Sequence, residues 1–220
     1  GSCGIESVPV QAGEKTCAIY QVKGLGALAE SIEAVGVGLV STDMSATVSI
    51  YANPEAGKPL SGQLLTTVPF ATSFAGFYTI DIPDAPVLNA GDTYSVVINW
   101  NKAGEIFIDK SYNNGNWIGF TANTANDKTY KVAANGTVTS FAASGTTARV
   151  KAYTKDAQAV APKPTYLVNY DANGGSGAPA SQKKTEGIAL TLSKTVPVRE
   201  GHDFAGWALS KDAVEAVYKP

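Results

Sequence analysis

The sequence predicts an all-β protein: a β-sandwich or jelly-roll domain followed by a smaller second unit. About ten short segments place apolar or β-branched residues at every second position, which is the period of a half-buried strand. Gly, Pro, Asn and Asp separate these segments at short intervals. No helical periodicity of useful length competes with this pattern before residue 155. Many short strands with turns between them are typical of sandwiches and jelly rolls.

The stretch from Gly76 to Trp100 shows the pattern most clearly. Residues 78–82 alternate large apolar side chains with Thr79 and Asp81, and residues 94–100 repeat the alternation. Pro86 and Gly91 supply turn chemistry between the two segments, because Pro fixes φ and Gly tolerates positive φ. We expect two strands joined over the end of a pair of stacked sheets.

The other strands are expected at short spacing on both sides of this stretch. Gly24 and Gly26 follow a strand with the spacing of a dinucleotide-binding fingerprint, which requires a helix next. Residues 32–39 instead have the pattern of a strand, so the glycines are predicted to form a turn. The full set of predicted strands is 16–22, 32–39, 46–51, 62–68, 78–82, 94–100, 105–110, 117–121, 130–133 and 148–154.

Composition and charge exclude several classes of partner. The net charge is −2 and only 16% of residues are charged, so a basic stripe for nucleic acid is not expected. No apolar run approaches the roughly 20 residues of a membrane span. A chain low in Lys and Glu and rich in Thr, Ser, Ala, Gly and Asn is typical of secreted bacterial surface proteins. We expect an extracellular monomer, and an excised fragment because the chain opens abruptly at Gly1.

The two cysteines leave two alternatives open. Cys3 and Cys17 form a disulfide in a secreted chain, or they are unrelated, with one belonging to a neighbouring domain.

A family resemblance follows from the order of the segments at residues 34–36, 48–51, 61–64, 76–80, 88–92 and 95–98. This order resembles the lectin-like domain that follows the catalytic domain in papain-family surface cysteine peptidases of Gram-positive anaerobes. The resemblance implies a lectin-like sandwich over residues 17–154. Residues 3–10, from Cys3 through Ser7 into an apolar run, resemble the carboxyl end of papain-like enzymes, so residues 1–16 are expected to be the tail of an upstream peptidase domain. The chain itself is not expected to be an enzyme, because it lacks a Cys–His–Asn set.

A linker and a second module complete the chain. Residues 155–164 contain two prolines, alanines and charges without periodicity, as a semi-extended tether does. Residues 165–220 resemble an internalin-type B repeat, a small β-grasp module of surface proteins, on the motifs from Tyr170 to Gly175 and from Gly201 to Trp207. His202 stands where the repeat usually has an aromatic residue and is expected to be half-buried. The repeat is expected to be truncated before its last strand.

The candidate ligand site is an aromatic and amide-rich segment. Tyr and Trp offer flat apolar faces with a polar edge, and Asn offers a donor and an acceptor, which together suit a sugar ring. The alternative is a hairpin turn whose Trp packs against the sandwich. The residues are Trp117, Tyr112, Asn113, Asn114 and Asn116.

No cofactor and no catalytic or metal site is predicted, although a structural calcium ion remains open. Five aspartates in or near loops offer oxygen ligands, but the sequence does not show that they converge. They are Asp43, Asp84, Asp92, Asp109 and Asp127.

Two functions remain open. The first is the non-catalytic C-terminal region of a secreted papain-like cysteine peptidase, which binds a glycan, the cell wall or a substrate. The alternative is an adhesin or spacer module of a bacterial surface protein that binds protein partners.

Overall fold

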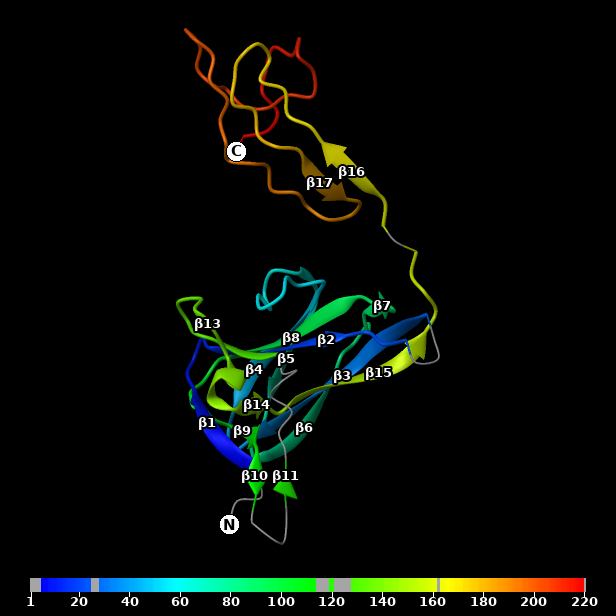
Figure 1. The fold of residues 1–220 in the computed structure, drawn as a ribbon, viewed down its shortest axis with the longest axis vertical. Coiled ribbons are helices and arrows are strands. Elements are labelled where there is room, and N and C mark those ends of the chain that lie inside the picture. Colours follow the sequence, from blue (N-terminus) through cyan, green and yellow to red (C-terminus); the bar gives the residue numbers. More distant parts are fainter. Residues whose placement is uncertain (1–4, 25–27, 114–118, 121–127, 162, 220) are drawn as a thin grey trace. The chain divides into compact units, whose positions relative to one another are not determined.

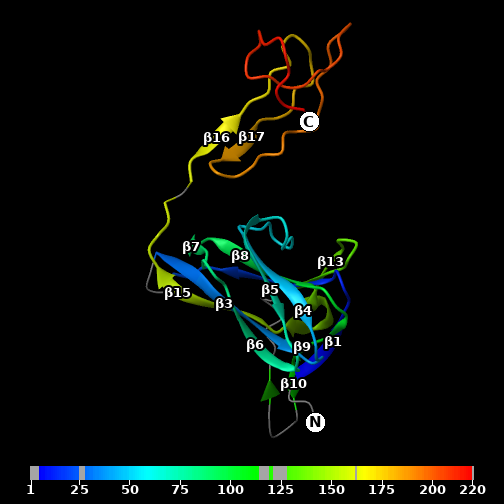
Figure 2. The ribbon, with the colours of Figure 1, turned by 180° about the vertical axis from the view of Figure 1, so that it is seen from behind.

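The computed structural model describes residues 5–24, 28–113, 119–120, 128–161 and 163–219. The chain divides into two compact units, residues 1–160 and 161–220. The first unit consists of two antiparallel sheets that face each other, as Figures 1 and 2 show from opposite sides. The all-β class and the sandwich are therefore confirmed. No helix among the described residues is long and apolar enough to cross a membrane.

Sheet A, as far as the chain is described, has seven strands. Its main strand order is β1–β9–β3–β15. In addition, β14 pairs with β9, and β6 and β7 pair with β3. The bounds are β1 (Ile5–Val10), β3 (Ala29–Leu39), β6 (Gly76–Asp81), β7 (Val87–Asn89), β9 (Gly104–Lys110), β14 (Thr146–Ala148) and β15 (Val150–Ala157).

Sheet B has six strands within the described residues, in the order β13–β12–β2–β8–β4–β5. The bounds are β2 (Lys15–Gln21), β4 (Ser45–Ala52), β5 (Gln63–Ala71), β8 (Thr93–Trp100), β12 (Thr129–Val132) and β13 (Val138–Ser140). A 3₁₀ turn, η1 (Phe141–Ser144), follows β13; the Ser140 side chain caps its start and Gly145 (φ 66°) ends it. A short ribbon of β10 (Tyr112–Asn113) and β11 (Gly119–Phe120) extends beyond β9.

The stretch from Gly76 to Trp100 crosses from one sheet to the other, as expected. Its first strand, β6, pairs with β3 in sheet A, and its last strand, β8, lies between β2 and β4 in sheet B. Between them, the predicted turn includes a short strand, β7, because residues 87–89 hydrogen-bond to the start of β3. The next described element after Gly24 is also a strand, β3, which begins at Ala29.

The core lies between the two sheets. Val35, Val37 and Leu39 of β3 face it from sheet A, while Ile98 and Trp100 of β8 face it from sheet B, and each is at most 4% exposed. Burying a side chain of this size is worth about 1.5–3 kcal/mol. Alternate residues on both strands point away from this core, as the two-residue period requires.

The amino-terminal segment lies in the sandwich. Residues 5–10 form β1, which pairs with β9 along its whole length. The assignment of residues 1–16 to the end of an upstream peptidase domain stays a prediction. At the other end, β15 continues to Ala157, so it includes the first residues of the expected linker. The Asn89 side chain then holds Val160 by two hydrogen bonds of 2.8 Å, donating to its carbonyl and accepting from its N–H.

The second unit is small and also formed of β structure. Strands β16 (Thr165–Val168) and β17 (Gln182–Thr185) form a hairpin, and isolated bridges join Ser176 to Val198 and Trp207 to Tyr218. Three rings, those of Tyr170, Phe204 and Trp207, pack edge to face with centroids 4.8–5.0 Å apart. The expected truncation of the repeat stays a prediction.

Candidate binding face on the outer side of sheet A

The outer face of sheet A is built over two glycines of β3. Val35 and Val37 point into the core, so Gly36 and Gly38 point outward. Gly38 pairs with Phe77 of β6, and Gly36 pairs with Thr79. Both glycines are nevertheless buried, because aromatic side chains from neighbouring strands lie over them.

Two phenylalanine rings stack over Gly38. Phe77 of β6 and Phe107 of β9 have ring centroids 5.2 Å apart and an interplanar angle of 18°. A Cβ at Gly38 would stand 2.8 Å from Phe77 Cε1 and 2.9 Å from Phe107 Cδ2. The rings therefore occupy the space that a side chain on β3 would take. Phe77 remains 65% exposed.

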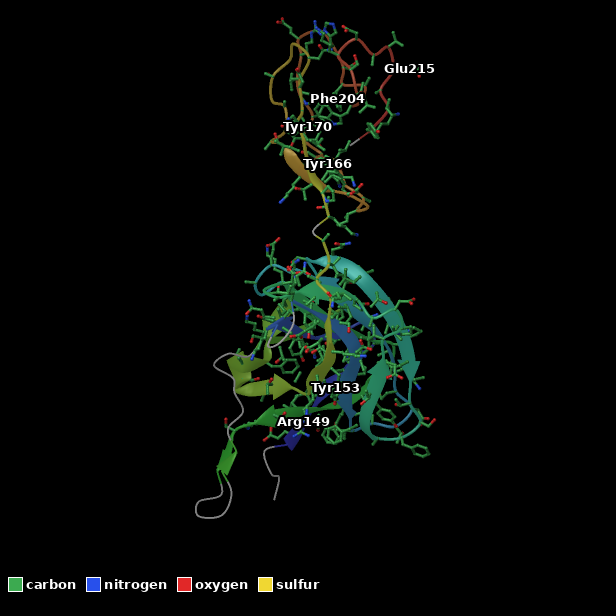
Figure 3. All side chains as sticks on the ribbon, turned by 90° about the vertical axis from the view of Figure 1, so that its right-hand side faces the viewer. Arg149, Tyr153, Tyr166, Tyr170, Phe204 and Glu215 are labelled. Carbon is green, nitrogen blue, oxygen red and sulfur yellow. The ribbon has the colours of Figure 1, made fainter. Side chains whose placement is uncertain are left out.

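Arg149 joins this stack from the junction of β14 and β15. Its guanidinium carbon lies 5.4 Å from the Phe77 ring centroid, within cation–π range. Its Nε and Nη2 atoms lie 2.7 and 2.6 Å from Asp109 Oδ1, and its backbone N–H donates to the Phe107 carbonyl. The expected strand over residues 148–154 is interrupted here, since β14 ends at Ala148 and β15 begins at Val150. Figure 3 shows Arg149 near Tyr153 on this part of the sheet.

Tyr153 covers the second glycine. A Cβ at Gly36 would stand 3.1 Å from Tyr153 Cε2 and 3.2 Å from its hydroxyl oxygen. The ring is 46% exposed. Lys151, the preceding outward residue of β15, pairs with Gly36 and is also exposed. We call the set Phe77, Phe107, Tyr153, Arg149 and Lys151 the aromatic platform.

The aromatic platform is unusual for the outside of a sandwich, where outward residues are normally polar. Phe77 and Tyr153 are 65% and 46% exposed on this face, and neighbouring exposed rings mark an interaction surface more strongly than scattered apolar residues do. Phenyl and phenol faces bind flat apolar surfaces, and the two cations at one side bind acceptor oxygens. The arrangement is suited to binding and contains no nucleophile paired with a base.

The site predicted from the sequence lies almost entirely outside the described residues. Asn114, Asn116 and Trp117 are outside them, and for Tyr112 and Asn113 only the backbone is described, paired with Phe120 and Gly119. Their binding role stays a prediction. The aromatic platform was missed. Its signal was an aromatic residue at the outward phase of a strand, Phe77, combined with glycine at alternate positions of another strand.

The other sequence candidates are dispersed. Asp109 is paired with Arg149, and Asp92 accepts a hydrogen bond from the Asn89 backbone N–H. Asp43 and Asp84 adopt positive φ in turns, and Asp127 is outside the described residues. No three His, Cys, Asp or Glu side chains cluster as metal ligands in the described part of the chain.

The expectation of a half-buried His202 is wrong. Its ring is exposed and its Nδ1 atom lies 2.9 Å from the Glu200 carbonyl oxygen, because the tight turn at Gly201 directs the side chain outward.

Cys17 has a free thiol in the described structure. It lies on the outer face of sheet B and packs with Val97 and Val132, away from sheet A and its strand β1. Burial raises the pKa of this thiol to about 12, so it is protonated at neutral pH. Cys3 lies outside the described residues, and this placement of Cys17 favours the alternative of two unrelated cysteines.

The model of the lectin-like domain family matches residues 6–154, which is more than half of the chain. The chain belongs to the lectin-like domain family. A second model, the Listeria–Bacteroides repeat domain, matches residues 166–219. The resemblances drawn from the sequence are thereby confirmed for both parts of the chain. Among curated proteins, none matches.

Two solved structures are similar to the lectin-like chain. One contains the cysteine protease and lectin-like domains of Cwp84, a surface-layer-associated protein of Clostridium difficile, with 12% identity and a TM-score of 0.51 over 71% of this chain and 37% of that one. The other is the clostridial cysteine protease Cwp84 after propeptide cleavage, with 14% identity and a TM-score of 0.49 over 71% and 41%. The chain spans less than half the length of either structure. At this identity, the first likeness shows the shared fold.

Proposed function

We propose that this chain is a non-catalytic binding module that attaches a secreted cysteine protease to glycans of the bacterial cell surface. The observation that carries the proposal is the exposed Phe77 ring stacked on the half-buried Phe107 ring over Gly38, on the outside of sheet A. A sugar ring has an apolar face of C–H groups, and an exposed aromatic ring offers a complementary surface without a deep pocket. Family membership and the surface-associated neighbour support the location and the parent protease.

The residues of the chain support a non-catalytic role. Papain-type hydrolysis needs a thiolate activated by a histidine. Cys17 is buried with its pKa raised to about 12, and His202 lies in the other unit. Cys17 therefore lacks the ionised state that this chemistry requires.

The test is retention of the 220-residue chain on immobilised cell-wall polysaccharide. Phe77→Ala should reduce retention, because it removes the most exposed ring of the aromatic platform. Phe74→Ala is the matched control: Phe74 is 74% exposed, in the turn before β6, and outside the aromatic platform. If Phe77→Ala is retained as strongly as the parent chain, the stack of Phe77 and Phe107 does not bind the polysaccharide, and the proposal loses its main support. A shallow site binds weakly, with a Kd on the order of 1 mM, so an immobilised polymer is preferable to a free monosaccharide.

The same assay tests the segment predicted from the sequence. If Trp117 stacks on a sugar, Trp117→Ala abolishes retention and leaves Tm within a few degrees. If Trp117 packs against the sandwich, its loss costs about 3–5 kcal/mol and the domain melts far earlier.

A second candidate function is a spacer or adhesin that binds protein. The second unit favours it, because large apolar side chains are exposed there: Leu167 (66%), Val198 (70%), Leu209 (85%) and Val214 (100%). A hollow of about 930 Å³ beside Tyr170, Phe204 and Trp207 adds to this surface. Retention of the chain on immobilised cell-surface protein that depends on Leu209 and not on Phe77 would favour this function.

A further inference from the structure

We propose that the aromatic platform takes a linear acidic glycan, which lies along β3 with one sugar on Phe77, another on Tyr153, and a carboxylate or phosphate on Lys151 beside Tyr153. The inference rests on the proposed glycan-binding function and adds the ligand's charge and length. It follows from the spacing of the rings and from the positions of the cations.

The spacing of the rings sets the length of the ligand. Phe77 lies over Gly38 and Tyr153 over Gly36, so the two exposed rings are separated along β3 by two residues. Two residues of a strand span about 7 Å, which exceeds the width of a single sugar ring. One monosaccharide therefore reaches only one ring, whereas a chain of two or three sugars reaches both.

The cations set the charge of the ligand. Lys151 lies beside the Tyr153 ring, because it pairs with Gly36, the residue that this ring covers. Along the chain, Lys151 stands between Arg149, which contacts Phe77, and Tyr153. Lys151 is exposed and has no ion pair within the described residues. Arg149 directs Nε and Nη2 to Asp109, and its Nη1 has no partner in the described part of the chain. Both groups are therefore able to bind an anion beside the rings.

The acidic residues of this face do not offset Lys151. Asp109 is paired with Arg149, and Glu105 of β9 accepts a hydrogen bond from the Ser7 hydroxyl. Asp81 of β6 and Tyr153 of β15 both pair with Ala34 of β3, so Asp81 lies across β3 from Tyr153, whereas Thr79 lies across β3 from Lys151. The cationic side of the aromatic platform is thus the β15 side, and an acidic group of the ligand is expected there.

The test compares acidic polysaccharides with their own neutral derivatives. The full chain is run by affinity electrophoresis against hyaluronan, alginate and polygalacturonate, each beside the same polymer after its carboxylates have been methyl-esterified. The parent chain should be retarded by at least one acidic polymer and several-fold less by its ester. Equal retardation by polymer and ester overturns the acidic ligand and leaves the proposed function standing. If neither these polymers nor cell-wall polysaccharide retards the chain, both proposals fail.

Variants locate the contact. Lys151→Met should weaken binding of the retained acidic polymer by about three- to fivefold, as loss of one screened ion pair does, and should leave binding of the ester unchanged. Lys151→Arg keeps the charge and should retain most of the affinity. Lys58→Met, at an exposed lysine in the loop before β5, is the control and should have no effect. If Lys151→Met and Lys58→Met behave alike, the anion does not bind at Lys151.

Length is tested with oligosaccharides cut from the retained acidic polymer. Inhibition of retardation should rise steeply between one sugar and three, because a monosaccharide reaches a single ring. In Tyr153→Ala this length dependence should disappear, whereas a purely structural role of Tyr153 would lower Tm and leave the dependence in place. A monosaccharide that inhibits as well as a trisaccharide overturns the two-ring geometry.

Discussion

In the centre of the sandwich, the indole Nε1 of Trp100 donates a 2.9 Å hydrogen bond to the hydroxyl oxygen of Thr16 on the neighbouring strand β2. Trp100 is 0% exposed and Thr16 is 1% exposed. A buried indole N–H without a partner is costly, so Thr16 allows the largest side chain of the core to point inward. The ring also meets Phe70 of β5 edge to face at 6.4 Å.

Replacing Thr16 with Val should destabilise the lectin-like domain although it conserves shape. The change leaves the Trp100 N–H unpaired in the core, which should lower the free energy of unfolding by about 1–3 kcal/mol. Urea denaturation followed by Trp fluorescence measures this. Thr16→Ser keeps the hydroxyl and should cost about 1 kcal/mol or less. Equal losses for Val and Ser would show that packing, and not the hydrogen bond, is what matters at this position.

The acid stability of the domain should depend on Glu14. Burial alone would raise the pKa of this carboxyl, but hydrogen bonds from Lys131 at 2.8 Å and from the Gln11 backbone N–H at 2.9 Å lower it below its ordinary 4.5. A carboxyl with a lowered pKa in the folded state stabilises above its unfolded pKa, and this stabilisation is lost as the pH falls through the folded pKa.

Glu14→Gln should therefore be less stable than the parent at pH 7, by at most about 1 kcal/mol for a partly exposed pair. The difference should shrink as the pH falls below 4.5. Urea titrations of both proteins at pH 7 and pH 3 measure it. A difference that stays constant between the two pH values would mean that ionised Glu14 contributes nothing to folding.

The strands were predictable because their signal is local. Alternation at residues 94–100 identifies β8, and the structure confirms that every second side chain there faces the core. Sheet membership is not local: only the short strand β7 separates β6 from β8 in sequence, yet β6 and β8 lie in different sheets. The break between β14 and β15 at Arg149 was also not predictable from the sequence, because it arises where the chain stops pairing with β9 and begins to pair with β3.

The aromatic platform illustrates the same limit for function. Phe77, Phe107 and Tyr153 come from three strands that meet only when β3 lies in their midst. None of their sequence neighbourhoods contains a motif. The amide-rich segment around Trp117 attracted the prediction because its residues are contiguous. Ligand-binding surfaces on sheets are assembled across strands, so contiguity is a poor guide to them.

The thiol of Cys17 should be unreactive in the folded protein. Burial raises its pKa to about 12, so the thiolate fraction is negligible at pH 8. Under reducing conditions that exclude disulfides, iodoacetamide followed by peptide mapping should leave Cys17 unmodified in buffer and modify it fully in urea. Rapid labelling in buffer would show that sheet B opens locally at β2.

Replacing Gly62 with Ala should destabilise the domain more than replacing Gly38 with Ala. A Cβ at Gly62 would stand 2.3 Å from the Ala52 carbonyl oxygen, a backbone atom that cannot move aside. Gly62→Ala should therefore cost about 1–3 kcal/mol or more through overpacking, and lower Tm accordingly.

A Cβ at Gly38 would stand 2.8 Å from Phe77 Cε1 and 2.9 Å from Phe107 Cδ2, which are side-chain atoms; Phe77 is 65% exposed and Phe107 is half-buried. Gly38→Ala should therefore displace the rings, above all the exposed Phe77, with a cost of about 1 kcal/mol or less because a side chain at the surface moves aside more easily than a backbone atom. Retention on the polysaccharide should fall as it does in Phe77→Ala, while Tm changes little. If Gly38→Ala retains full binding, the stacked arrangement is not what the ligand contacts. If its Tm falls as far as that of Gly62→Ala, the two rings belong to the stable framework of sheet A and are held too rigidly to repack around a methyl group.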